Sequence, residues 1–381
     1  MRLVQPVPVC LCLPPAVFRR NRRAVKNEEG GGRRMKVTIH DVAQRANVSI
    51  ATVSRVVSRN SHVRTATRQR VEKAIEELQY IPNAAARELN NKRSMTIGVI
   101  VPSIGNTFFT NVISGIENEC RHQGYSLFLC VCEHDADLEK KQIYELMSRN
   151  VAGIIIVDAN LQNIQKNFYE EVARLVPMTF INGMIDLPNV SCISNDEMMG
   201  TLIALQYLVA KQHHSILFVR GAYSRSYDIK EEAYTLFMKQ RGWFRKDYIL
   251  DIGEGNSLET VQHTMDKIVE VLQEPHSITA VLACNDLMAL GVMNACKKLG
   301  LKIRKDISII GFDNIELCQM IEPNLTTMDQ NMYLLGSNAS ILLQDMIQNK
   351  RCQKLLLHNI LVEGDTVGRN TAASHPVSIA V

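Results

Sequence analysis

The stretch 37–89 carries its apolar residues at helical spacing, in three successive groups. The first group falls on one face of a short helix and consists of Ile39, Val42, Ala43 and Ala46. Thr38 and Asp41 form the hydroxyl-x-x-acid signature of a helix N-terminus, and Asn47 suits the left-handed turn that ends such a helix. The pattern predicts a short helix followed directly by a tight turn.

A second helix is predicted from 50 to 57, with Ser49 as its cap. Its inward residues are Val53, Val56 and Val57, and a third helix closes the core with Val71, Ala74, Ile75 and Leu78. The residues left outside near the start of the second helix are Ile50, Ala51, Ser54 and Arg55. This layout matches a helix-turn-helix, whose second helix enters the DNA major groove. Because short amphipathic helices are common, the pattern alone leaves a DNA-binding unit and a purely structural unit both open.

From residue 95 onward, short continuous apolar runs alternate with helical stretches. The runs are mostly rich in β-branched residues and predict strands at 97–102, 126–132, 152–157, 178–182, 216–219, 280–284 and 307–312. Helices are predicted between them, among others at 111–123, 138–150, 199–211 and 287–299. Such strands indicate parallel sheets covered on both faces. The expected fold class is therefore an all-α helix-turn-helix headpiece and an α/β body of two doubly wound parallel-sheet subdomains.

Ligands bind such sheets outside the C-terminal ends of the strands. A nucleotide enzyme normally has a glycine-rich phosphate loop after its first strand, whereas VPSIGNTFF follows here. No pairing of a nucleophile with a base supports an enzyme either. We therefore expect no catalytic residues and no cofactor. No metal is expected either, because neither Cys10-x-Cys12 nor Cys130-x-Cys132 has a matching second pair and His213-His214 stands alone.

The headpiece resembles that of the lactose-repressor (LacI/GalR) family of bacterial transcription regulators. The matching motifs are T-I-x-D-V-A (38–43), A-N-V-S-x-x-T-V-S-R-V (46–56) and A-I-E-E-L-x-Y-x-P-N-x-x-A-R-x-L (74–89). The body is similar to the family's effector domain, itself related to periplasmic sugar receptors, through N-T-F-F (106–109), N-D-L-M-A-L-G (285–291), I-G-F-D-N (310–314) and L-T-T (325–327). The resemblance covers 36–375 and implies a periplasmic-binding-protein-like body.

The resemblance implies a homodimeric repressor that binds a pseudo-palindromic operator in double-stranded DNA. The residues expected to contact DNA are Thr38, Ser49, Ile50, Ala51, Thr52, Ser54, Arg55, Asn60, Arg87 and Leu89. The segment from Asn83 to Leu89 is too short to hold a helix alone, which leaves a flexible linker or a helix that folds on a surface. The family favours the latter, a hinge helix that pairs with its copy and inserts Leu89 into the minor groove.

The resemblance also implies the division of the chain. We expect a DNA-binding domain at 36–80, a hinge and linker at 81–94, an N-terminal effector subdomain at 95–195 with 329–357, and a C-terminal one at 196–328 with 358–376. The chain then crosses three times between the subdomains. A small-molecule effector, expected to be a sugar or sugar derivative, controls the affinity for the operator.

Five residues at the expected rim are candidates for effector binding: Phe108, Phe109, Asn195, Arg225 and Asp313. The aromatic rings can stack on a sugar or pack in the core. The Asp313 carboxylate can accept two hydroxyl hydrogen bonds or cap a helix. The family places a ligand-binding arginine at Arg225, where a solvated side chain is the alternative, and a polar residue that crosses between lobes at Asn195. Asp286 is expected to be a structural cap.

Two positions depart from the family pattern. Glu231 and Tyr234 stand where many members carry an arginine and a glycine. We expect this change to remove a cation from the site and to add bulk. A purine or one of the commonest sugar effectors should therefore not be assumed.

Charge is distributed unevenly along the chain. Residues 36–93 contain 11 Lys and Arg against 5 Asp and Glu, and residues 1–35 contain 8 against 2. The rest of the chain therefore has a net charge of −8, although the whole has +4. A basic N-terminal unit on an acidic body suits contact with phosphates at one end only. A sugar receptor that has lost DNA binding is the alternative function, and the basic charge weighs against it.

The remaining features concern the compartment. Residues 1–34 contain four prolines and no small-residue cleavage site, so we interpret them as an over-extended gene start before Met35, or otherwise as a disordered extension. No apolar run is long enough for a membrane span. The ten cysteines are scattered, and residues such as Cys130, Cys132 and Cys284 lie in apolar runs. They are expected to be buried thiols in a reducing cytosol.

Overall fold

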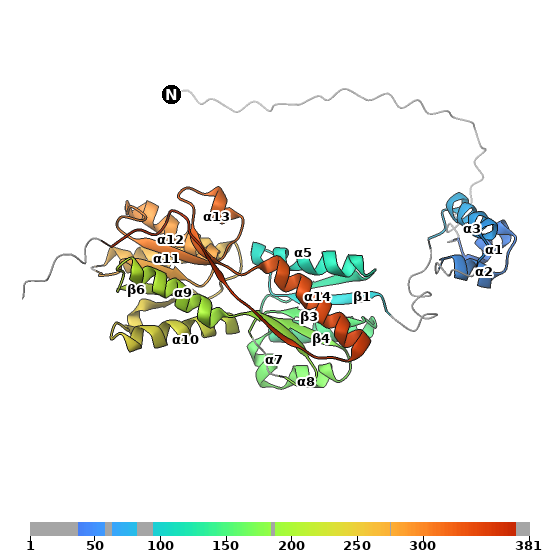
Figure 1. Cartoon of the computed structure of the whole chain (residues 1–381), viewed down its shortest axis with the longest axis horizontal. Coiled ribbons are helices and arrows are strands. Elements are labelled where there is room, and N and C mark those ends of the chain that lie inside the picture. Colours follow the sequence, from blue (N-terminus) through green and yellow to red (C-terminus); the bar gives the residue numbers. More distant parts are fainter. Residues whose placement is uncertain (1–36, 58–62, 82–93, 184–186, 275, 371–381) are drawn as a thin grey trace, which may run out of the picture. The chain divides into compact units, whose positions relative to one another are not determined.

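The computed structural model describes residues 37–57, 63–81, 94–183, 187–274 and 276–370, in a small N-terminal unit and a large body (Figure 1). Several expectations fall outside these residues: the extension 1–34, the hinge helix from Asn83 to Leu89, and the DNA contacts of Asn60, Arg87 and Leu89.

The N-terminal unit is a three-helix headpiece of α1 (Ile39–Ala46), α2 (Ile50–Val57) and α3 (Thr65–Leu78). The predicted core is confirmed, because Val42, Val53 and Val71 are fully buried together. Asn47 ends α1 in the left-handed conformation, at φ 51°. Ser49 Oγ accepts the backbone N–H of Thr52 at 3.2 Å, which confirms the predicted cap of α2.

The first lobe of the body has a six-stranded parallel sheet in the order β11-β5-β4-β3-β1-β2. Its strands are β1 (Thr96–Val101), β2 (Ser126–Val131), β3 (Gly153–Val157), β4 (Met178–Ile181), β5 (Ser191–Asn195) and β11 (Lys354–Leu357). Helices α5 (Thr107–His122) and α14 (Met332–Asn349) pack side by side on one face (Figure 1). The opposite face carries α6 (Ala136–Ser148), α7 (Leu161–Gln165) and α8 (Phe168–Ala173).

Helices α5 and α14 approach each other through two glycines. A Cβ atom placed on Gly115 would lie 2.1 Å from the backbone oxygen of Tyr333, and one on Gly336 would lie 2.0 Å from that of Val112. Any side chain at either position would therefore collide with the backbone of the facing helix. This contact fixes α14, which comes late in the chain, onto an early helix of the first lobe.

The second lobe has a six-stranded sheet in the order β12-β10-β9-β8-β6-β7, parallel except for the pair β10–β12. Its strands are β6 (Ile216–Arg220), β7 (Ile249–Asp251), β8 (Ala280–Ala283), β9 (Ser308–Asp313), β10 (Thr326–Asp329) and β12 (Ile360–Val362). One face is covered by α9 (Glu197–Ala210) and α10 (Arg225–Gln240), the other by α11 (Glu259–Gln273) and α12 (Asp286–Leu299) (Figure 1). The short elements η1 (Lys246–Tyr248) and α13 (Leu317–Met320) lie in connections.

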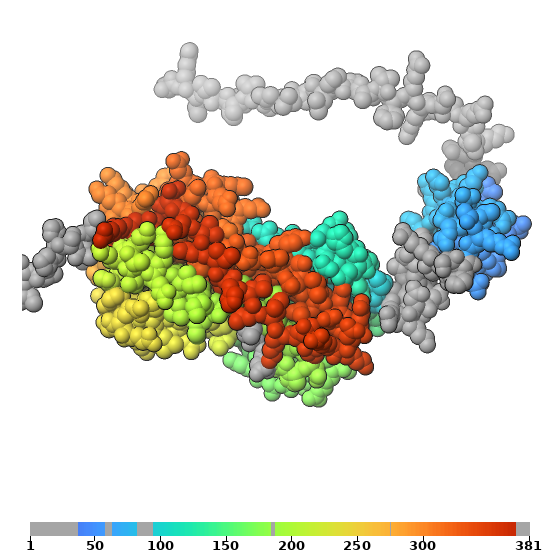
Figure 2. Space-filling view, in the orientation of Figure 1, coloured from blue at the N-terminus to red at the C-terminus, as the bar shows by residue number. Residues whose placement is uncertain are grey.

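The chain passes between the lobes after β5, after β10 and after β11. Its C-terminal part therefore runs over both lobes, as the red surface in Figure 2 shows. Each lobe depends on segments that lie far apart in the sequence. The crossings bring the C-terminal strand ends of both sheets toward one shared cleft.

The predicted fold class is confirmed, and all seven predicted strands are present with ends within one residue of those expected. The strands β5, β7, β10, β11 and β12 were not predicted. Among the residues that the structure describes, no helix has the length and apolar character that crossing a membrane requires.

Candidate functional site

Helix α2 presents one polar face to solvent because its other face closes the headpiece core. Val53 and Val56 are buried, so the residues on the opposite side point outward. The exposed residues predicted to contact DNA are Ser49, Ile50, Ala51 and Arg55, and Thr52 and Ser54 are partly exposed. The headpiece thus displays a hydroxyl- and guanidinium-bearing surface on a rigid helix.

Thr38 lies at the exposed start of α1, but its donors are already engaged. Both its backbone N–H and its hydroxyl donate to Asp41 Oδ2, at 2.7 and 2.8 Å. These bonds hold the pKa of Asp41 below its usual range. A phosphate contact by Thr38 would therefore compete with the bonds that begin the helix.

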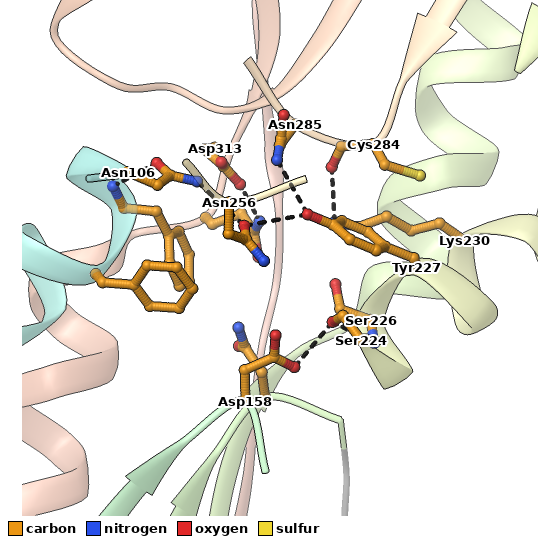
Figure 3. A pocket seen from close by; sticks show the side chains of 14 residues that line it. Asn106, Asp158, Ser224, Ser226, Tyr227, Lys230, Asn256, Cys284, Asn285 and Asp313 are labelled. Atoms are coloured by element: carbon orange, nitrogen blue, oxygen red, sulfur yellow. Dashed lines mark hydrogen bonds between the residues drawn. The ribbon is translucent and has the colours of Figure 1, made fainter. Parts of the chain in front are cut away.

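In the body, a cleft lies between the C-terminal strand ends of the two sheets (Figure 3). The first lobe contributes the start of α5 and the residues after β3 and β4, and the second lobe contributes α10 and the ends of β8 and β9. The lining residues are Asn106, Phe108, Phe109, Asp158, Asn182, Ser224, Ser226, Tyr227, Lys230, Asn256, Cys284, Asn285, Asp313 and Gln330. Amides, hydroxyls and carboxylates dominate, with aromatic rings at one side.

Direct hydrogen bonds join the two lobes across this cleft. Ser224 Oγ donates to Asp158 Oδ1 at 2.8 Å, as Figure 3 shows. Asn256 links the lobes twice, because its Oδ1 accepts from Asn106 Nδ2 at 3.4 Å and its Nδ2 lies 3.0 Å from His134 Nε2. A ligand that enters the cleft would have to replace these bonds.

The two cleft carboxyl groups face each other from different lobes. Burial raises the pKa of Asp158 to about 6. Burial and the neighbouring carboxylate of Asp286 raise the pKa of Asp313 well above its usual range. Asp313 also has an unusual backbone, with φ at 120°, and its Oδ1 accepts from Gln330 Nε2 at 2.5 Å. Each of these carboxyl groups therefore keeps its proton to a higher pH than an exposed carboxyl group does, and each already accepts one hydrogen bond within the protein.

A buried cation also lines the cleft, and it corrects one expectation from the sequence. Lys230, 2% exposed, reaches in from α10, and its Nζ donates to the backbone oxygen of Cys284 at 3.1 Å. The same atom lies 3.9 Å from Glu197 Oε1 and 4.1 Å from the ring centre of Phe312. The expected loss of a cation at position 231 therefore does not leave the cleft without positive charge, because the preceding residue on the helix, Lys230, supplies one.

Glu231 and Tyr234 have structural partners instead. Arg220, at the end of β6, binds the carboxylates of Glu231 and Asp228. The Tyr234 hydroxyl donates to the backbone oxygen of Ile216 at 2.7 Å, and its ring stacks on Phe218. The bulk of Tyr234 thus lies in the core of the second lobe and not in the cleft, which corrects the second expectation for these positions.

The five predicted effector residues have different positions. Phe108, Phe109 and Asp313 line the cleft, with the two rings edge to face at 5.3 Å between centres. Asn195 lies one layer behind, where its Nδ2 donates to the backbone oxygen of Gln330 at 2.7 Å. Arg225 is exposed and is not among the lining residues, although its Cβ lies close to Gly183 of the opposite lobe.

Asp286 is not a cap of its own helix. Asn285 caps α12, because its Oδ1 accepts the N–H of Met288 at 2.9 Å. The carboxylate of Asp286 accepts from the backbone N–H of Ile315 at 2.9 Å and from the Thr327 hydroxyl at 2.6 Å. It joins α12 to β10 behind the cleft, which is a structural role of a different kind.

The sequence reasoning missed the amides and the lysine of the cleft. Asn106 and Asn285 could have been found, because both are helix caps directly at the expected strand-end rim. Asn256 and Gln330 lie in connections without a distinct pattern. Within the described part of the chain, no cluster of three His, Cys, Asp or Glu residues could hold a metal ion.

Comparison with known proteins agrees with both parts of this geometry. Residues 38–83 match the family described as bacterial regulatory proteins, lacI family, and residues 94–366 match periplasmic binding proteins and sugar binding domain of LacI family. The chain is 35% identical over 335 residues to the HTH-type transcriptional repressor PurR of Vibrio vulnificus, covering 87% of this chain and 98% of the relative. It is 34% identical over 313 residues to catabolite control protein A of Priestia megaterium, covering 81% and 92%.

Solved structures give the same result. The lac repressor dimer bound to operator and the anti-inducer ONPF superimposes with a TM-score of 0.78 at 29% identity, over 87% of this chain and 98% of the other. A LacI family transcriptional regulator from Enterococcus faecium with bound ribose has a TM-score of 0.62 at 25% identity, over 72% and 99%. These relatives are regulators and not enzymes. The chain belongs to the LacI family and is a sequence-specific, DNA-binding transcriptional repressor with an effector-binding body.

Proposed function

We propose that this repressor acts as a homodimer on a two-fold symmetric operator in the bacterial cytosol, and that a polyhydroxylated small molecule sets its affinity for that operator. The observation that carries the proposal is the cleft between the lobes, which is lined from both sides by amides, carboxylates and aromatic rings. The dimeric relative bound to operator supports the assembly. The relative with bound ribose supports the ligand class.

The chemistry of the lining fits a sugar better than a flat apolar ligand. A carboxylate accepts hydrogen bonds from two adjacent hydroxyls, and an amide both donates to and accepts from hydroxyl groups. Asp158 and Asp313 provide the carboxylates, and Asn182 has a buried Oδ1 without a hydrogen-bond partner. Phe108 and Phe109 supply an aromatic wall beside them.

On the DNA side, the exposed face of α2 enters the major groove. Ser49, Ile50, Ala51, Thr52, Ser54 and Arg55 are the proposed contacts, with Thr38 at the start of α1. An arginine fork suits the O6 and N7 acceptors of guanine. The domain divisions at 36–80, 81–94 and the two discontinuous lobes are proposed as the functional units.

The two parts are coupled through the lobes. A ligand held by residues of both lobes binds one relative lobe orientation better than others, and it can shift the equilibrium only by that difference in affinity. In a dimer, a change of lobe orientation moves the two connections to the headpieces. Effector binding thus changes operator affinity without touching DNA.

The test uses operator DNA selected from random sequences by the purified protein. A sugar that stabilises the protein against heat is then added, and the change in operator affinity is measured by fluorescence anisotropy. The variant Asp313→Asn should lose the effector response while its effector-free operator affinity stays near that of the parent. If the effector is a corepressor, operator binding by the variant should itself be weak in the effector's presence.

The matched control is Asp365→Asn, which removes the same charge from an exposed site in the same lobe. It should leave the effector response unchanged. A full response in Asp313→Asn would show that the cleft is not the effector site.

A further inference from the structure

The charges around the cleft are unbalanced. Asp158 and Asp313 line it, and Glu197 and Asp286 are buried directly behind, with none of the four more than 7% exposed. Among the described residues that line the cleft, Lys230 is the only cation. Four acidic side chains are therefore gathered around one basic side chain in a space with little access to water.

The nearby arginines lie outside the cleft and offset this excess only in part. Arg220 is held by the carboxylates of Asp228 and Glu231, and its Nε donates to the backbone oxygen of Gly221 at 2.8 Å. Arg225 is exposed at the start of α10. Neither guanidinium is among the groups that line the cleft.

Lys230 itself is already engaged by the protein. Its ammonium group donates to Cys284, lies near Glu197 Oε1 and sits over the ring of Phe312 (Figure 3 shows the first of these contacts). Glu197 in turn accepts from the Ser226 hydroxyl, while its Oε2 has no hydrogen-bond partner. An anionic ligand could bind Lys230 only by displacing a buried carboxylate from its counter-charge, which is costly.

We infer that the effector of this repressor carries no negative charge, and that Lys230 serves the cleft as a counter-charge for Glu197 and not as an anchor for an anionic ligand. The inference rests on the proposed effector function and narrows its ligand class. Asp158, with a pKa of about 6, is ionised at pH 7.5, and its charge would repel the negative charge of a sugar phosphate or a uronic acid with little screening in the cleft. Neutral sugars and amino sugars instead supply hydrogen-bond donors to this carboxylate without adding a negative charge.

A matched ligand panel tests the ligand class with the full-length protein at pH 7.5. The panel contains glucose, galactose and mannose, each with its uronic acid, its 6-phosphate and its 2-amino derivative. Binding is measured by thermal shift and by calorimetry. We expect each neutral or amino ligand that binds to exceed its acidic and phosphorylated counterparts by at least about 100-fold in affinity.

The outcomes separate this inference from the proposed function. Binding of an acid or a phosphate as tightly as its neutral counterpart would overturn the inference and leave a sugar effector standing. If no member of the panel binds, the proposed sugar effector fails, and the inference about its charge fails with it.

Charge variants locate the cause of the discrimination. In Asp158→Asn, the ratio of neutral to acidic affinity should fall by about 10-fold or more, since the repelling charge is gone. The control Asp365→Asn removes an exposed carboxylate from the second lobe and should leave the ratio unchanged. An unchanged ratio in Asp158→Asn would contradict the assignment.

The role of Lys230 is tested through stability as well as binding. Lys230→Met should lower the temperature of unfolding, because Glu197 loses its counter-charge, and Lys230→Met/Glu197→Gln should recover most of that loss. The control Lys239→Met makes the same change at an exposed position of α10 and should have no such effect. If Lys230→Met unfolds like the parent and selectively loses an anionic ligand, Lys230 is an anion anchor and the inference is wrong.

Discussion

Arg55 lies on the exposed face of α2, one helical turn beyond the exposed residues Ile50 and Ala51. Val53 and Val56 anchor this helix in the headpiece core, so in the proposed complex the guanidinium would approach a base edge from a fixed direction. Replacement by alanine should reduce affinity for the selected operator by about 1–3 kcal/mol and relax the preference at one symmetric base position.

Binding to random DNA is the comparison for this variant. A phosphate contact would weaken specific and non-specific binding alike and reduce the salt dependence of both. An equal loss on operator and on random DNA would therefore show that Arg55 contacts the backbone and reads no base.

Asp158 should make the stability of the body depend on pH. Its pKa in the folded protein is raised by burial to about 6, above the usual value of 3.8. The folded state thus binds its proton more tightly than the unfolded state, so the free energy of unfolding should fall as the pH rises from about 4 to about 6. The loss due to this group should be roughly 1–3 kcal/mol.

The variant Asp158→Asn isolates this contribution, because the amide oxygen can still accept from Ser224 but cannot ionise. Urea unfolding at pH 4.5 and pH 7 gives the difference in stability between variant and parent at each pH. The variant should gain stability relative to the parent at the higher pH. A difference that does not change with pH would contradict the raised pKa.

At the scale of elements, the contact between α5 and α14 depends on the absence of side chains at Gly115 and Gly336. Alanine at Gly115 would add roughly 1 kcal/mol of helix propensity. Its Cβ would, however, lie 2.1 Å from the Tyr333 oxygen and 2.9 Å from the Ser337 nitrogen, and backbone atoms cannot move aside cheaply. We expect Gly115→Ala to lower the free energy of unfolding by about 1–3 kcal/mol.

The neighbouring substitution Ser114→Ala provides the control, since Ser114 is exposed on the same helix. Its effect should stay within about 0.5 kcal/mol in the same urea titration. If Gly115→Ala has the same free energy of unfolding as the parent, the two helices can move apart without a loss of stability, and the close contact is not required.

Elements with continuous apolar sequences could be predicted, and those whose stability depends on buried polar partners could not. Strand β10 reads TTMD, and its buried Thr327 is satisfied by the carboxylate of Asp286 at 2.6 Å. Strand β5 similarly contains buried Ser194 and Asn195. Such hydrogen bonds come from distant parts of the chain, so the local pattern contains no signal for the strand.

The same limit applies to the cleft. The strand-end rule and the family resemblance led to Phe108, Phe109 and Asp313, which lie at predictable ends of strands or just after them. Lys230 stands in the helical sequence IKEEAY, where neighbouring charges suggest a solvated face. Its burial follows from the packing of α10 against Phe312 and Glu197, which only the folded structure reveals.

At the scale of the whole molecule, the body should unfold as one cooperative unit. Helix α14 and strand β11 belong to the first lobe but follow β6 to β10 of the second lobe in the sequence. Strand β12 belongs to the second lobe but follows β11 of the first. Each sheet is complete only when the segments that cross from the other lobe are in place, so the two lobes should fold and unfold together.

Two natural reporters test this cooperativity. Trp243, the only tryptophan of the chain, packs against His214 in the second lobe, and Cys132 is a buried thiol of the first lobe. The urea midpoints from Trp243 fluorescence and from mass-spectrometric labelling of Cys132 should coincide. Midpoints separated by more than the error of the measurement would show that the lobes unfold independently.

The three crossings between the lobes also restrict how genes of this family can exchange parts. A crossover between two relatives at one point within the second lobe would give the first lobe strands β1 to β5 from one parent and α14 and β11 from the other. The close approach at Gly115 and Gly336 would then have to match by chance. An intact lobe can be inherited only as two separate gene segments, so effector specificity is expected to change through substitutions around the cleft more readily than by transfer of a whole lobe.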